Sequence, residues 1–304
     1  MNKDHDVPYK FESLTEFHKV LGLKKPLHPL VSFINIEDIK VSPDELSNCY
    51  ILNFYKIAYK SSIKKRVKYG QNHFDFGEGG MIFTAPNQLF EAPDDTENEG
   101  KILFIHPDFL LSYPLAKKIK QYSYFSYSTN EALHLSDKEK STIYSVFRII
   151  EDELLNTIDD FSQDVIISQI ETLLNYSNRF YNRQFITRKV LNNDLLGKLE
   201  DILNNYFDEE ESVNRGIPTV QFVSEQLNIS SSYLSDMLRS LTGQNAQQHI
   251  HNKLIEKAKE KISTTKLTIS EIAFQLGFEH SSSFNKLFKS KTEMSPLEFR
   301  KSFN

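Results

Sequence analysis

The stretch Thr268-Ile-Ser-Glu-Ile-Ala-Phe-Gln-Leu-Gly-Phe278 decides the fold, because the chain contains it twice in related form. The earlier copy reads Thr219-Val-Gln-Phe-Val-Ser-Glu-Gln-Leu-Asn-Ile229. A second pair of similar stretches follows, Tyr233–Thr242 after the first copy and Ser283–Thr292 after the second. Since an internal repeat sets the architecture, the C-terminal part of the chain is predicted to contain one structural unit twice.

Each copy predicts a helix, a tight turn and a second helix. Asn228 stands at the first turn and Gly277 at the second, and both residue types tolerate the left-handed conformation that reverses a chain after a helix. The polar residues that follow each turn are suited to capping the second helix. Apolar residues recur at helical spacing in both copies: Val220, Val223, Leu227, Leu234, Leu238, Leu241, Ile269, Ile272, Leu276, Phe284, Leu287 and Phe288.

The residues between the copies predict one continuous helix over 245–263. Ile250, Leu254, Ala258 and Ile262 recur every fourth residue, and neither Pro nor Gly interrupts them. Such a helix is roughly 27 Å long. Two helix-turn-helix units, at about 219–241 and 269–290, held apart by this helix suit duplex DNA, because the major groove presents successive faces about 34 Å apart. A generic helical repeat is the weaker alternative.

Three segments carry a family resemblance: Thr268–Phe278, Phe284-Asn-Lys-Leu-Phe-Lys, and Ser295-Pro-Leu-Glu-Phe-Arg300. Together they resemble the C-terminal signature of AraC/XylS-type transcription regulators, and the first copy is similar to that family's first helix-turn-helix. The specific match covers about 195–304. The resemblance implies sequence-specific binding to double-stranded DNA. For the rest of the chain, which matches only in layout, it implies a cupin-like sensor domain, helices that dimerise, a small-molecule effector and contact with RNA polymerase.

The outward faces of the two recognition helices are the candidate DNA-binding surfaces. Asn reads adenine, Lys reads guanine or binds phosphate, and Ser does either, so the residue types suit base and phosphate contacts. For any single residue, a solvated face is the alternative. The candidates are Ser231, Ser232, Ser235, Asp236 and Arg239 in the first helix, and His280, Ser281, Ser282, Asn285, Lys286 and Lys289 in the second.

Two residues depart from the family pattern. Asp236 stands where many members carry a basic or amide side chain, so the first recognition helix is expected to bind weakly or to prefer a site that contains cytosine. Glu293 replaces the glycine that corresponds to Gly243, so the turn after the second recognition helix is expected to differ. Lys289, Lys291, Arg300 and Lys301 are further phosphate candidates, whereas the lysines of the 245–263 helix are expected to form a solvated face.

The remaining sequence predicts an α+β protein. Short aromatic and aliphatic runs over about 27–110, separated by Gly, Pro, Asn and Asp, predict a small β-barrel, and 122–127 is expected to add a strand. Helices are expected over 136–154, where Ser136 and Glu139 have capping-box spacing, and over 163–183 and 194–207, with connectors at 184–193 and 208–216. The predicted domains are a cupin-like β sensor domain (1–134), a helical dimerisation region (135–190) and a DNA-binding domain (191–304).

Charge and motif searches bear on the alternatives. The net charge of −5 divides into −8 over 1–216 and +3 over 217–304, which supports nucleic-acid binding only weakly. A cupin-like metal enzyme and a non-DNA interaction protein remain alternatives. His73 and His106 lack ligand spacing, Cys49 is expected to be a packed thiol, and no nucleotide-binding or nucleophile motif occurs. We therefore expect no enzyme, cofactor or metal. With no signal peptide or membrane-spanning segment in the sequence, a cytoplasmic protein is expected.

Overall fold

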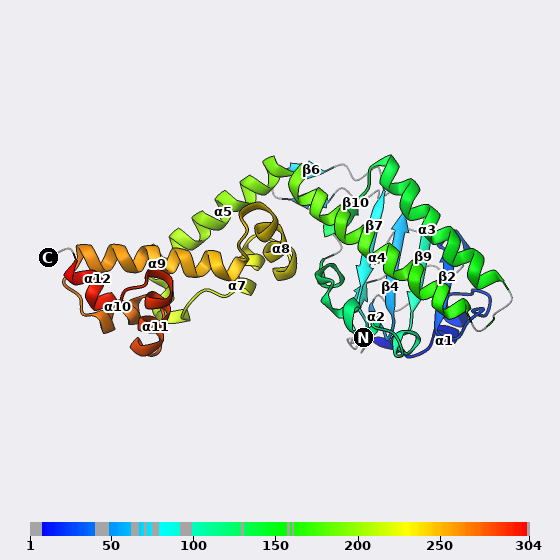
Figure 1. Cartoon of the computed structure of the whole chain (residues 1–304), viewed down its shortest axis with the longest axis horizontal. Coiled ribbons are helices and arrows are strands. Elements are labelled where there is room, and N and C mark those ends of the chain that lie inside the picture. The colour runs from blue at the N-terminus through cyan, green and yellow to red at the C-terminus, as the bar shows by residue number, and fades with distance from the viewer. Residues whose placement is uncertain are drawn as a thin grey trace, which may run out of the picture. The chain divides into compact units, whose positions relative to one another are not determined.

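The computed structural model describes residues 8–39, 49–61, 67–69, 72–74, 79–91, 99–128, 131–156, 159 and 161–302. Residue contacts divide the chain into two units, 1–184 and 185–304 (Figure 1). The three domains expected from the sequence stay a prediction, and the contacts group residues 135–184 with the β-rich unit. Among the described helices, none combines the length and the apolar character that crossing a membrane requires.

The first unit is rich in β-structure. Its main sheet has five strands in the order β10-β7-β4-β9-β2, all antiparallel to their neighbours, while β1-β3-β8 and β5-β6 form smaller sheets. This confirms a β-rich N-terminal unit. The described strands are β1 (Tyr9–Phe11), β2 (Val31–Asn35), β3 (Cys49–Leu52), β4 (Tyr55–Lys60), β5 (Val67–Tyr69), β6 (Asn72–Phe74), β7 (Gly80–Thr84), β8 (Leu89–Glu91), β9 (Gly100–Ile105) and β10 (Leu133–His134).

Helices cover one face of the main sheet. The strand register places Phe33, Leu103, Ile57 and Phe83 side by side on this face. The helices α3 (Asp137–Leu155) and α4 (Ser162–Thr187) run across the sheet there (Figure 1), and the Phe33 ring lies 5.5 Å from that of Phe147 in α3. The two expected helices therefore pack against this face of the main sheet.

The opposite face of the main sheet has its own core. Ile34, Ile102 and Phe104 pack there against residues of β1, β3 and the short helix α1 (Leu14–Val20). The sequence reading missed α1, although Ser13 accepts a hydrogen bond from the Glu16 amide and so marks the start of the helix. The remaining short helices of this unit are η1 (Ile36–Asp38), η3 (Pro107–Leu110), α2 (Leu115–Lys118), η4 (Ile119–Gln121) and η5 (Ser123–Ser126).

The strand expected over 122–127 is wrong, because this segment forms the 3-10 turn η5. Tyr124 is buried between other aromatic rings, 4.6 Å from Phe83 and 5.4 Å from Tyr181. Its hydroxyl donates to the Leu174 carbonyl at 3.0 Å. The aromatic residues that suggested a strand therefore anchor the segment against α4 through side chains instead of pairing through the backbone.

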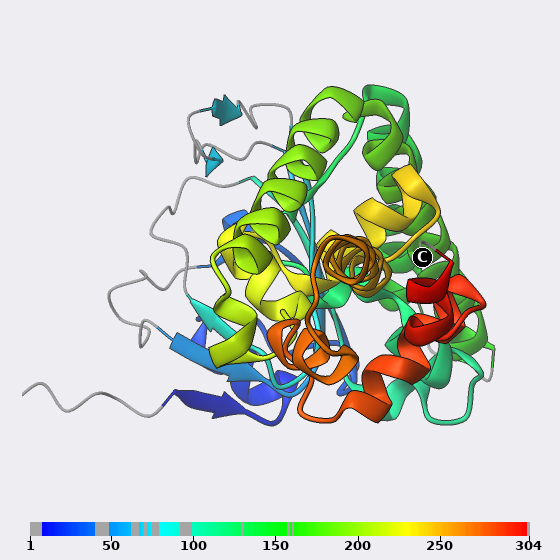
Figure 2. The same cartoon turned by 90° about the vertical axis from the view of Figure 1, so that its left-hand side faces the viewer.

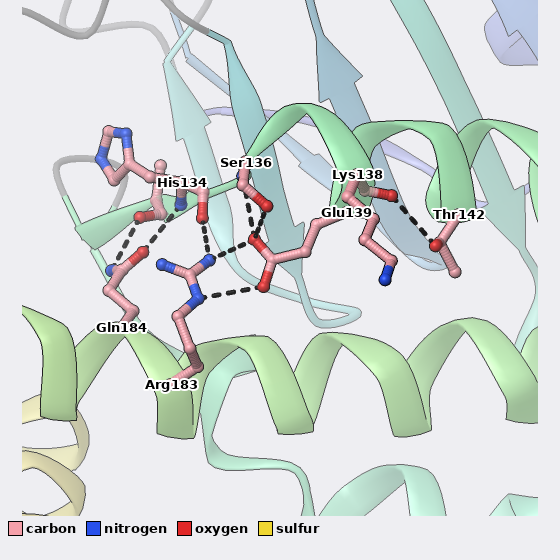
Figure 3. Close-up of polar contacts among 8 residues, drawn as sticks. His134, Ser136, Lys138, Glu139, Thr142, Arg183 and Gln184 are labelled. Atoms are coloured by element: carbon pink, nitrogen blue, oxygen red, sulfur yellow. Dashed lines mark hydrogen bonds and ion pairs between the residues drawn. The ribbon is translucent and has the colours of Figure 1, made fainter.

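One polar network joins α3, α4 and β10 (Figure 3). The predicted capping box is confirmed, since the Ser136 amide donates to the Glu139 carboxylate at 2.8 Å. Arg183 of α4 donates to the same carboxylate at 2.6 Å and to the His134 carbonyl at 2.7 Å. Gln184 accepts from the His134 amide at 2.8 Å, so two neighbouring residues of α4 fix the end of β10.

The described part of the second unit is entirely helical. The two recognition helices and the long helix between them are confirmed. Figure 2 looks almost along α9, with the orange and red helices of the second repeat beside it. The helices are α5 (Lys189–Asp208), α6 (Glu211–Arg215), α7 (Val220–Gln226), α8 (Ser231–Thr242), α9 (Ala246–Thr264), α10 (Ile269–Gln275), α11 (Ser281–Thr292) and α12 (Pro296–Lys301).

Candidate nucleic-acid interface

The first helical hairpin consists of α7 and α8. Asn228 reverses the chain in the left-handed conformation with φ 55°, as predicted, and Ser230 caps α8 by accepting from the Tyr233 amide at 3.1 Å. Leu234 and Leu238 are buried under α8. Ser231 lies 2.8 Å from the Ser224 hydroxyl, so this candidate residue ties the two helices of the hairpin together.

The outward face of α8 carries Ser232, Ser235, Asp236 and Arg239. The Arg239 Nη1 donates to the Asp236 Oδ1 at 2.7 Å, across one turn of the helix. The arginine side chain is 56% exposed and the aspartate side chain 20% exposed. The cation on this face is therefore compensated by a neighbouring carboxylate.

The second helical hairpin consists of α10 and α11. Gly277 makes the turn with φ 89°, as predicted, and Phe284 and Phe288 are buried below α11. The structure brings the remaining candidates together on and before the exposed side of this helix: His280, Ser281, Ser282, Asn285, Lys286 and Lys289.

Two of the three lysines of α11 have no ion-pair partner among the described residues. Within the described ranges, no carboxylate oxygen lies at ion-pair distance from Lys286 or Lys289. Both lysines border an open groove of about 530 Å³, whose other walls come from Asn285, the start of α10 and the start of α12. The groove thus combines two lysine side chains with an amide that can hydrogen-bond.

The two recognition helices start differently. Side-chain capping by the polar residues is confirmed for α8, but it is wrong for α11. The N-cap of α11 is His280, whose side chain makes no capping hydrogen bond. Only the backbone closes this turn, through the Ser283 amide and the His280 carbonyl at 3.1 Å.

The two recognition helices end alike. Gly243 follows α8 with φ 76°, and Glu293 follows α11 with φ 64°. Each of these residues donates its amide to the carbonyl four positions earlier, at 3.0 Å to Arg239 and at 2.9 Å to Lys289. The different turn expected at Glu293 is therefore wrong: the repeat keeps its backbone, and a glutamate occupies a conformation that favours glycine.

A segment that sequence reading treated as a connector braces the second hairpin. The Ser212 hydroxyl of α6 donates to the Gln275 carbonyl at 2.6 Å, and the Tyr206 hydroxyl donates to the Gly216 carbonyl at 2.9 Å. A Cβ atom on Gly277 would lie 2.5 Å from the carbonyl carbon of Gly216. The backbone of the hairpin turn and that of residues 216–217 thus touch, which no local sequence signal revealed.

Most other cations of this unit have structural partners. In α9, Lys257 bonds to Asp208 at 2.6 Å, which raises the pKa of Lys257, and Lys253 bonds to Glu256 at 2.8 Å. The phosphate candidate Arg300 donates Nε to the Ile262 carbonyl at 3.3 Å, and its Nη2 is buried without a hydrogen-bond partner among the described residues. The Lys291 ammonium donates to Asn252 at 3.2 Å. These contacts hold the helices together, whereas Lys286 and Lys289 of α11 have no ion-pair partner among the described residues.

The β-rich unit shows an aromatic core. The Phe17 ring lies 5.4 Å from that of Phe54 and 5.2 Å from that of Phe104. Within the described ranges, no three His, Cys, Asp or Glu side chains gather as a metal site requires. The side chains of Cys49 and His73 lie outside what the structure describes, while His106 accepts from the Asp108 amide at 3.3 Å.

Comparison with known proteins gives a family match within the C-terminal unit. A family model described as a helix-turn-helix domain matches residues 223–302. An uncharacterized HTH-type transcriptional regulator of Staphylococcus aureus is 28% identical over 138 residues, which are 45% of this chain and 17% of that protein. The Msm operon regulatory protein of Streptococcus mutans is 33% identical over 82 residues, which are 27% of this chain and 30% of that protein. The chain therefore spans less than a third of these relatives.

Solved structures give similar matches. The C-terminal domain of the response regulator yesN from Fusobacterium nucleatum is 34% identical; the match covers 33% of this chain and 96% of that one, with a TM-score of 0.29. ToxT from Vibrio cholerae is 18% identical; the match covers 89% of this chain and 97% of that one, with a TM-score of 0.30.

Proposed function

We propose that the chain regulates transcription by binding a specific site on duplex DNA, because its C-terminal unit matches a helix-turn-helix family model and resembles the DNA-binding domain of AraC-type regulators. The observation that carries this proposal is the repeated hairpin: α8 and α11 both expose polar faces, and the single helix α9 lies between the two hairpins in the sequence. A recognition helix fits the major groove, so two of them can read two successive segments of the groove.

The two recognition helices contribute unequally in this proposal. Lys286 and Lys289 of α11 have no ion-pair partner within the described ranges and can bind phosphate or guanine, and Asn285 can read adenine. On α8, the charge of Arg239 is compensated by Asp236. The second hairpin therefore supplies more of the electrostatic affinity. The residues proposed to form the DNA-binding surfaces, by contact or by positioning a neighbour, are Ser231, Ser232, Ser235, Asp236, Arg239, His280, Ser281, Ser282, Asn285, Lys286 and Lys289.

Selection of binding sites by the full chain from a pool of random DNA duplexes tests the proposal. We expect one preferred sequence, bound with an affinity that falls as the salt concentration rises. The double variant Asn285→Ala with Lys286→Ala should lose base preference at the second half of the site. Lys289→Ala should weaken binding to all sequences. It should also reduce the salt slope, which is the slope of log affinity against log salt concentration, by about one. The absence of any binding at low salt would refute the proposal.

Lys257→Ala is the matched control for the lysine variants. It removes a lysine of the same unit that is bonded to Asp208 and lies outside both recognition helices. Its salt slope should equal that of the unchanged chain. A reduction as large as that of Lys289→Ala would mean that the slope reports overall charge and not contacts of α11.

For the first unit, we propose a cupin-like barrel that forms a homodimer. Exposed apolar residues at the adjoining ends of α3 and α4 support the dimer: Leu155 is 67% exposed and Phe161 is 71% exposed. Analytical ultracentrifugation of the full chain tests this, since Phe161→Ser with Leu155→Ser should shift a dimer towards monomer. A monomer at all concentrations would refute it.

In this scheme the protein works in the cytoplasm, where a small-molecule effector and RNA polymerase are its further partners.

A further inference from the structure

We propose that Asp236 is a positioning residue, which holds Arg239 in the orientation that reads a guanine. The first hairpin then specifies a G·C base pair through one arginine supported by one carboxylate. This inference rests on the proposed function, since it assigns a specificity to one of the two recognition helices.

The geometry of the pair favours support of the arginine by the aspartate. Both side chains lie on the outward face of α8, three residues apart, where helical side chains are neighbours. Their bond is 2.7 Å long. The carboxylate is 20% exposed and the guanidinium 56% exposed, so the aspartate is the more enclosed member and the arginine extends from it into solvent.

The donors of the guanidinium suit a guanine. An arginine has five N–H donors in a fixed plane, and the bond to Asp236 uses Nη1. Arg239 has no other polar partner among the described residues, so its remaining donors are available. Guanine offers two acceptors, O6 and N7, in the major groove, and an arginine binds both at once. Holding the guanidinium beforehand reduces the side-chain entropy that is lost on binding.

The neighbouring side chains of α8 are less suited than Arg239 to reading a guanine. Ser232 and Ser235, on the same face, are short, and Ser231 is bonded to Ser224 inside the hairpin. Arg239 is the long, cationic side chain of the α8 face. It is therefore the side chain of this face with the longest reach towards a base edge.

Two other roles for Asp236 fit the structure less well. It could accept directly from the N4 amino group of cytosine, but its Oδ1 is already bonded to Arg239. It could instead repel DNA phosphates, but a guanidinium at 2.7 Å compensates its charge. The three roles predict different responses to the same substitutions, which makes them separable.

A double-mutant cycle with the full chain tests the inference. The preferred duplex is first selected from a random pool with the unchanged chain, and each base pair is then substituted singly. Arg239→Ala identifies the base pair read by Arg239, where the unchanged chain should prefer guanine about 5- to 150-fold. Asp236→Ala should reduce the preference at this same base pair at least threefold. In the Arg239→Ala background, Asp236→Ala should change no preference, because residues that act as a unit are non-additive.

Three results of this cycle would overturn the inference, and a fourth follows from the variants below. The first is an Arg239→Ala chain that keeps every base preference. The second is Asp236→Ala lowering a preference for cytosine equally in both backgrounds, which would make Asp236 a base reader. The third is Asp236→Ala strengthening binding to all sequences alike, which would make it a repulsive charge. If the unchanged chain selects no sequence at all, the proposed function itself has failed.

Two further variants guard against indirect effects. Asp194→Ala removes a similar helical ion pair in α5, in which Lys198 bonds to Asp194 at 2.7 Å, and it should leave all base preferences unchanged. Asp236→Asn keeps an acceptor oxygen in the same place, so it should preserve more of the guanine preference than Asp236→Ala. Equal losses for the two Asp236 variants would show that the hydrogen bond does not position Arg239.

Discussion

Replacement of Gly277 by alanine tests how the second hairpin is held. This glycine forms the turn between α10 and α11 with φ 89°. An added Cβ would lie 2.5 Å from the Gly216 carbonyl carbon, 2.7 Å from the Ile217 amide nitrogen and 2.8 Å from the Gly216 carbonyl oxygen. All three are backbone atoms, which cannot move aside as a flexible side chain does. Gly277→Ala should therefore displace the turn or the 216–217 segment.

The size of the effect combines two costs. A left-handed conformation costs a non-glycine residue about 1–2 kcal/mol, and overpacking costs about 1–3 kcal/mol more. We therefore expect Gly277→Ala to lower the free energy of unfolding of the second unit by about 2–5 kcal/mol. Gly243→Ala isolates the first cost, because Gly243 has φ 76° and no described residue lies within 4 Å of its Cβ position. This variant should lose about 1–2 kcal/mol of unfolding free energy.

Gly197 supplies the opposite control. It lies inside α5, and no described residue lies within 4 Å of its Cβ position, so Gly197→Ala should stabilise the unit by about 0.5–1 kcal/mol. The assay is amide hydrogen exchange of the full chain, read from peptides of α9, because exchange resolves the stability of one unit within a larger protein. A loss for Gly277→Ala no greater than that for Gly243→Ala would refute a rigid contact between the two backbones.

The remaining predictions concern single contacts. Glu293→Gly should raise the unfolding free energy of the second unit by about 1 kcal/mol, measured by the same exchange assay, because Glu293 has a left-handed φ of 64°; no gain would contradict the strain. Arg183→Met should destabilise the first unit by about 1–3 kcal/mol in urea unfolding, since it leaves the mostly buried Glu139 without its cation; a neutral result would mean that water replaces Arg183. Hydrogen bonds from the Thr268 amide and hydroxyl lower the pKa of Glu271. The stability that this carboxylate contributes is therefore complete above the pKa of the unfolded state, and it is lost as the pH falls through the pKa of the folded state. Unfolding should therefore become easier below about pH 4.5, and less steeply so in Glu271→Gln.

The second unit was predictable because its signals are local. The left-handed positions at Asn228 and Gly277 follow from residue type, and the apolar spacing places Leu234 and Phe284 in the core. The duplication then supplied an internal check that a single hairpin lacks. The outward faces of α8 and α11 followed directly from the buried ones.

Contacts between distant residues were not predictable. Nothing near Ser212 in the sequence indicates its bond to Gln275, and nothing near Arg300 indicates that it bonds to the end of α9 at Ile262. The aromatic composition around Tyr124 predicted a strand, but this segment forms a 3-10 turn. Asp236 and Arg239 have the spacing of a helical ion pair, so their pairing was predictable from the sequence. The two residues are considered separately in the sequence-based prediction.

Footprinting of the full chain on its selected duplex tests the central claim most directly. If both hairpins read DNA, methylation protection should reveal two protected major-groove segments, centred about 10 base pairs apart on one side of the duplex. Lys286→Ala with Asn285→Ala should remove protection from one segment only. A single protected segment, or loss of both segments together in this double variant, would contradict two hairpins that read the DNA side by side.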